Sequence, residues 1–67
     1  MTVKFYVKQI DTETNETSEK FLFSQNSGLM MIGLKIADQG TVYQVDALEW
    51  IDKKKGILKA VCLEVPQ

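Results

Sequence analysis

The chain has 67 residues with eight lysines, no arginine, nine acidic residues and no histidine, which gives a net charge of −1. That balance excludes a field strong enough to attract nucleic acid or an anionic membrane from a distance, and the length allows one domain, residues 1–67. A single cysteine without histidine excludes both an internal disulfide and a metal cage of thiolates and imidazoles.

The small size itself predicts an association. A chain of this length buries only about 60% of the surface that its unfolded form exposes, so its own core is marginal. The core must therefore suffice by itself, or a homodimer must enlarge it. The beginning of the chain lacks the apolar core of a signal peptide, and no stretch reaches the roughly 20 apolar residues of a membrane span. We therefore expect a cytoplasmic protein without a membrane partner.

The first third of the sequence predicts a hairpin. Val3, Phe5 and Val7 alternate with polar or amphipathic residues over 2–10, which is the period of a half-buried strand. A polar stretch follows at 11–19 and predicts a long loop. Strand-favouring residues resume at 20–24 and complete the hairpin.

The apolar segment 29–37 fits two secondary structures. As a strand, it places Met30, Ile32, Leu34 and Ile36 on one face. As a helix over about 28–38, it would carry Gly33 in its middle, where glycine costs about 1 kcal/mol relative to alanine. We favour the strand because the alternation is unbroken over four apolar positions.

The strand predicted at 41–51 changes parity in its middle. It begins with apolar residues at odd positions, but Leu48 and Trp50 are even. A β-bulge near Asp46–Leu48 would turn both side chains inward, whereas a regular strand would leave them as an outer apolar patch. The last strand, 57–65, is apolar on both faces, as in a central strand that is covered on both sides.

Five strands with short connections predict an all-β domain, namely a five-stranded antiparallel SH3-like barrel. A ββαββ fold with a helix at 28–38 and an OB-like barrel are the alternatives. The pattern formed by Gly33, the segment 40–45 and Trp50 resembles the hairpins of many small bacterial and phage barrels. That likeness concerns the fold and implies no activity.

Catalysis is not expected. Histidine, the commonest general base, is absent. Cys62 lies among apolar residues, which favours a buried side chain over a nucleophile. Asp46 and Glu49 have no recognisable oxyanion donor near them in the sequence. We therefore predict a protein that is not an enzyme and needs no cofactor.

The sequence predicts a module that acts through contact with another protein. Interfaces favour large aromatic and apolar anchors, and the candidates are Tyr6, Tyr43, Leu48 and Trp50. The alternative is a weak nucleic-acid binder, in which cations flank an aromatic side chain that stacks on bases. Its candidates are Lys4, Tyr6 and Lys8 on one strand face and the turn residues Lys53, Lys54 and Lys55.

Overall fold

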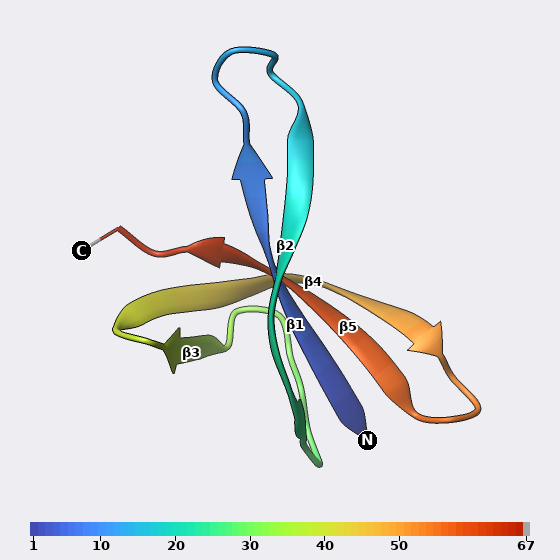
Figure 1. Ribbon diagram of the computed structural model, residues 1–67. Helices are drawn as coiled ribbons and strands as arrows, with labels where there is room; N and C mark the ends of the chain where they lie inside the picture. Colours follow the sequence, from blue (N-terminus) through green and yellow to red (C-terminus); the bar gives the residue numbers. More distant parts are fainter. Residues whose placement is uncertain (67) are drawn as a thin grey trace.

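The computed structural model describes residues 1–66, which form five strands and contain no helix (Figure 1). The strands are β1 (Thr2–Ile10), β2 (Thr17–Asn26), β3 (Lys35–Asp38), β4 (Thr41–Asp52) and β5 (Ile57–Glu64). The predicted all-β class is confirmed. The first hairpin is longer than expected, because β2 begins at Thr17 and leaves only residues 11–16 as the loop.

The five strands form one sheet in the order β2-β1-β5-β4-β3. Three pairings are antiparallel, as predicted, but β1 and β5 run parallel in the middle of the sheet. The expectation of antiparallel neighbours throughout was therefore wrong at this pair. Parallel neighbours require a crossover connection. The segment after β2 starts that crossover by carrying the chain to the opposite edge of the sheet (Figure 1).

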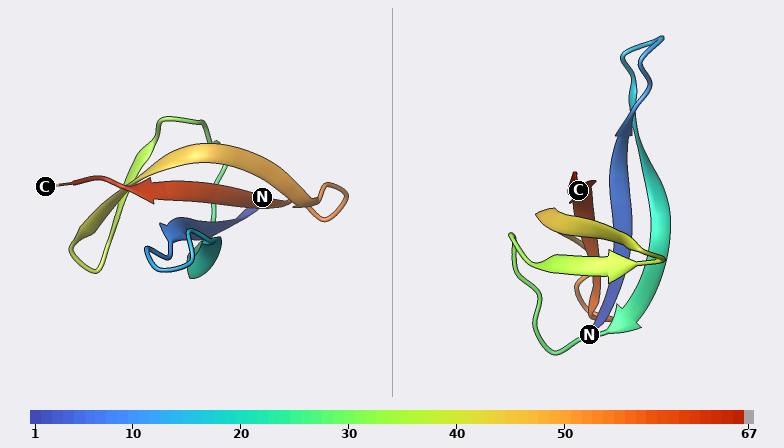
Figure 2. Two further views of the ribbon diagram at one scale, coloured as in Figure 1. Left: turned by 90° about the horizontal axis from the view of Figure 1, so that it is seen from above. Right: turned by 90° about the vertical axis from the view of Figure 1, so that its left-hand side faces the viewer.

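The sheet curls into a half-barrel rather than a closed barrel (Figure 2). Its two edge strands, β2 and β3, are not paired with each other. This shape is compatible with a small SH3-like or OB-like barrel. The strong curl follows from the right-handed twist of strands, increased where β-bulges interrupt the pairing.

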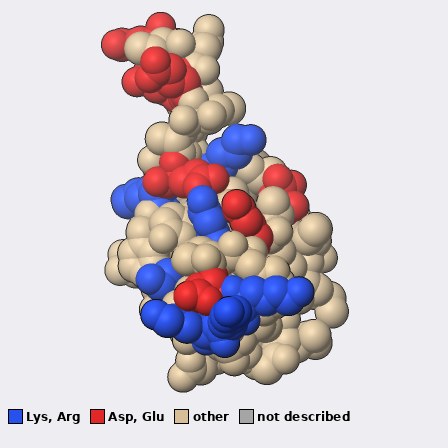
Figure 3. Space-filling view, turned by 90° about the vertical axis from the view of Figure 1, so that its right-hand side faces the viewer, with Lys and Arg blue, Asp and Glu red and all other residues tan. Residues whose placement is uncertain are grey.

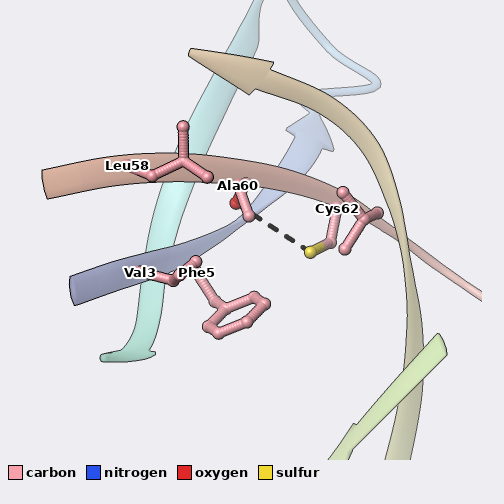
Figure 4. Close-up of a cluster of buried hydrophobic side chains, with 6 residues drawn as sticks. Val3, Phe5, Leu58, Ala60 and Cys62 are labelled. Atoms are coloured by element: carbon pink, nitrogen blue, oxygen red, sulfur yellow. Dashed lines mark hydrogen bonds between the residues drawn. The ribbon is translucent and has the colours of Figure 1, made fainter. Parts of the chain in front are cut away.

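The core lies on the concave face of the half-barrel. Val3 and Phe5 on β1 stand opposite Leu58 and Ala60 on β5, and Figure 4 shows these side chains together with Cys62. All five are 6% exposed or less. The Phe5 ring also stacks on Phe23 of β2, with 4.7 Å between the ring centroids. The odd residues of β1 and the even residues of β5 thus share one face because the strands are paired in that register.

The β-bulge predicted in the fourth strand is present. The register with β5 shifts between Val45 and Ala47, so that Leu48 stands opposite Ala60. Leu48 packs against the core, as the bulge interpretation requires. Trp50 stands opposite the core residue Leu58 but remains 47% exposed, so the expected inward position of Trp50 was only partly correct.

The helix considered for segment 28–38 is absent, and the strand predicted at 29–37 is correct only for its last three residues. Residues 27–34 form a loop with a turn at Ile32–Gly33, and only Lys35–Asp38 is a strand. Gly33 has a φ of +95°, which is compatible with neither an α-helix nor a regular strand. The loop is attached to β4 because the Gly33 N–H donates to the Val45 carbonyl and the Val45 N–H donates to the Leu34 carbonyl, each at 2.8 Å.

Candidate interaction surface

The four residues predicted to bind a protein partner do not form one surface. Tyr6 lies on the convex face of the sheet and meets Phe21 edge to face, with ring centroids 5.4 Å apart. Tyr43 is half-buried on β4 and borders a hollow of about 340 Å³. Leu48 packs on the core, and Trp50 lies two residues further along β4. Among the four, only Trp50 is an exposed side chain.

The largest exposed apolar side chains of the crossover loop were missed by the sequence analysis. Leu29 is 68% exposed, Met31 51%, Ile32 64% and Leu34 38%. Met30 alone packs against the core. We call residues 29–34 the apolar loop. The sequence indicated this exposure, because residues 29–34 have apolar side chains at both odd and even positions. A strand with one buried face needs them at alternate positions only.

The apolar loop is held in place at both ends. The Ser27 hydroxyl donates to the Leu29 carbonyl at 2.7 Å. At the other end, the Gln44 side-chain amide donates to the Gly33 carbonyl at 3.3 Å, in addition to the two backbone bonds to Val45. The exposed side chains are therefore presented by an ordered segment.

The lysines of the nucleic-acid alternative are only partly brought together. Lys4, Tyr6 and Lys8 share the convex face, as predicted. The lysine turn (Lys53–Lys55) lies next to the beginning of β1. Gly56 directly follows this turn, and its carbonyl accepts a hydrogen bond from the Thr2 N–H at 2.8 Å. The turn thus extends the lysine face near Lys4. Lys8 lies further along β1, opposite Glu19.

Acidic side chains interrupt this lysine face. The ammonium of Lys59 lies 5.1 Å from the Tyr6 ring centroid and forms an ion pair with Glu19. The hydrogen bond to Glu19 raises the pKa of Lys59 above its ordinary value. Glu49 stands opposite Lys59 on β4. Figure 3 shows lysines gathered towards one end of the molecule with acidic side chains among them, and a separate acidic group at the opposite end.

Cys62 has the environment of a core residue. It is completely buried, and its thiol donates a weak hydrogen bond to the Ala60 carbonyl over 3.9 Å (Figure 4). Burial raises the pKa of the Cys62 thiol to about 11. The nucleophilic thiolate is therefore disfavoured near neutral pH.

Residues 1–66 contain no group of three Asp, Glu, Cys or His side chains placed to bind a metal ion. The same residues contain no helix that could cross a membrane. The chain matches no protein-family model, and neither the curated proteins nor the solved structures contain a significant match to it.

Proposed function

We propose that the protein is a non-catalytic module that acts by binding another protein through the apolar loop. The observation that carries this proposal is the exposure of four large apolar side chains within six consecutive residues, at 38–68% each. Single exposed apolar residues are common on protein surfaces, whereas a contiguous group indicates an interaction site.

The chemistry of the loop favours a protein partner with an apolar surface. Burying a Leu, Ile or Met side chain completely contributes about 1.5–3 kcal/mol. Methionine adapts its shape to irregular surfaces and is enriched in interfaces. The hydrogen bonds at Leu29 and Gly33 keep the loop ordered before binding. This order reduces the entropy cost of association.

Two matched substitutions test the proposal. Ile32 and Ile10 are 64% and 65% exposed, but Ile10 belongs to the β1–β2 hairpin. A photo-crosslinker introduced at Met31 would capture the partner, and calorimetry would then compare its affinity for the variants. We expect Ile32→Ser to weaken binding by about tenfold or more, because a buried isoleucine contributes more than 1.4 kcal/mol. Ile10→Ser should bind as the natural sequence does.

Unchanged binding by Ile32→Ser would contradict the proposal. If both variants bind the captured partner with unchanged affinity, the apolar loop is not the interface. Circular dichroism of the two variants would serve as the folding control, since both side chains are mostly solvated and neither change should alter the fold.

The nucleic-acid alternative rests on the Tyr6–Phe21 pair, which Lys4 and Lys8 flank on one sheet face. Such an aromatic pair could stack on the bases of a single strand while the lysines contact phosphates. Fluorescence anisotropy with a labelled oligonucleotide at low salt tests it. Binding should weaken steeply as salt rises and should be lost in Tyr6→Ala together with Lys4→Ala. The absence of binding at low salt would eliminate this alternative.

A further inference from the structure

Exposed lysines lie near both ends of the apolar loop. Lys35 directly follows Leu34, and the lysine turn (Lys53–Lys55) lies on the side where the loop begins. All four side chains are exposed. The ion pair within residues 1–66 joins Lys59 to Glu19 and involves none of these four lysines. Their ammonium groups are therefore free to meet an anionic group of a partner.

Backbone hydrogen bonds place the lysine turn beside the start of the apolar loop. The Ser27 N–H donates to the Met1 carbonyl at 2.9 Å, and the Thr2 N–H donates to the Gly56 carbonyl at 2.8 Å. The start of β1 therefore lies between Ser27 and Gly56, and Figure 1 shows the N-terminus between the crossover loop and the turn that joins β4 to β5. Because neighbouring strands lie about 4.8 Å apart, Ser27 and Gly56 are separated by about 10 Å.

One bound segment can reach both surfaces. Leu29 is two residues after Ser27, and the lysine turn ends one residue before Gly56. An extended peptide advances about 3.3 Å per residue, so four or five of its residues span about 15 Å. A partner that seats an apolar side chain against Leu29 can therefore place another residue of the same segment beside the lysine turn.

The neighbouring acidic residues do not cancel the charge of the lysine turn. Segment 52–56 contains three lysines and one aspartate. The Asp52 carboxylate accepts a hydrogen bond from the Lys55 N–H at 3.1 Å. Asp46 lies further along the sheet, where it lines a hollow of about 190 Å³ together with Ile32. The acidic hairpin loop (residues 11–16) is at the end of the molecule away from the gathered lysines (Figure 3).

We propose that the partner of the apolar loop is a protein segment with acidic residues within about five positions of its apolar anchors, and that these acidic residues bind the lysine turn. This inference rests on the proposed function, because it assigns the chemistry of the partner for the same surface. Burial of apolar side chains holds the segment on the loop. The opposite charges fix its direction and speed its association.

A protein segment fits this surface better than a nucleic acid does. The exposed side chains of the apolar loop are two leucines, one isoleucine and one methionine. Single-stranded nucleic acids are held by stacking of their bases on aromatic side chains, and the apolar loop contains none. Its side chains instead match the apolar anchors of a peptide, while carboxylates match the lysines.

Selection from a random peptide library displayed on phage tests this inference. Three immobilised proteins are compared: the natural sequence, Ile32→Ser, and Lys53→Gln combined with Lys54→Gln (the turn variant). The natural sequence should enrich peptides that contain large apolar residues with Asp or Glu within five positions. The turn variant should still enrich apolar peptides but without the acidic residues. Ile32→Ser should enrich both kinds poorly.

A selected peptide with a fluorescent label gives the magnitude. In fluorescence anisotropy at low salt, the turn variant should raise the dissociation constant by about two- to thirtyfold, because two exposed ion pairs are lost. Salt should reduce this difference. The matched control is Lys8→Gln combined with Lys20→Gln, which removes two exposed lysines of the hairpin and changes the net charge equally. It should leave the affinity nearly unchanged.

The outcomes separate this inference from the proposed function. Enriched peptides without acidic residues would overturn the inference and leave the proposed function standing, as would an affinity equal in the turn variant and the natural sequence. The absence of enrichment, or binding that Ile32→Ser does not weaken, would overturn both. Tighter binding to an oligonucleotide or to phosphatidylserine vesicles, weakened by Ile32→Ser and by the turn variant, would also overturn both.

Discussion

The pH dependence of stability gives a direct test of the position of Cys62. Its pKa is 9.0 in an unfolded chain and about 11 in the folded protein. Between these values the unfolded chain has released the thiol proton while the folded protein still holds it. Stability must therefore fall as the pH rises through this window. The loss from pH 8 to pH 10 is about 1.3 kcal/mol, since a shift of one pKa unit corresponds to 1.36 kcal/mol.

That loss is a substantial fraction of the total. A 67-residue protein is typically stable by about 3–10 kcal/mol. Urea denaturation of the natural sequence and of Cys62→Ala, followed by circular dichroism at both pH values, measures the effect. Between pH 8 and pH 10, the free energy of unfolding of the natural sequence should fall by about 1.3 kcal/mol more than that of Cys62→Ala. All other ionisable groups are the same in the two proteins, so their contributions cancel.

A parallel pH dependence in the two proteins would refute the reasoning. It would mean that water reaches the Cys62 thiol and that the contact between β1, β4 and β5 is looser than described. A thiol reagent offers an independent check at pH 8. It should modify Cys62 slowly in the folded protein and quickly in urea, because the thiolate is the reactive form.

Two further comparisons test the turns and the core. Gly40 has a φ of +80°, so Gly40→Ala should cost about 1–2 kcal/mol and lower the melting temperature by several degrees. Gly28→Ala should change it little, because Gly28 has no positive φ and no atom near its added Cβ. Phe5→Ala should cost about 3–5 kcal/mol, since Phe5 is fully buried and stacked. Trp50→Ala should cost less than half of that because Trp50 is 47% exposed; an equal loss would place Trp50 in the core.

The sequence predicted the strands where apolar and polar residues alternate. β1 was correct at both ends because Val3, Phe5 and Val7 need only one buried face. The bulge in β4 was also predictable, since Leu48 can face the core only if the parity changes after Val45. These features depend on side-chain direction along one strand, which the order of residues specifies.

The apolar loop could not be predicted in the same way. Met30, Ile32, Leu34 and Ile36 alternate as a strand would, but Met30 and Ile36 pack against the core while Ile32 and Leu34 are exposed. Hydrogen bonds to Val45, a residue of β4, hold the loop in this conformation. The candidate site was missed because the apolar run was assigned to the interior of the sheet.

The local pattern of the sequence was sufficient for the class of fold, the buried face of β1, and the burial of Cys62, because alternation and composition act over a few neighbouring residues. Only the tertiary structure decided that β1 and β5 are parallel neighbours, that β2 keeps a free edge, and that the apolar loop is exposed. Each of these results depends on where the chain crosses the sheet between Ser27 and Leu34. That path is set by contacts between residues far apart in the sequence, which side-chain periodicity does not encode.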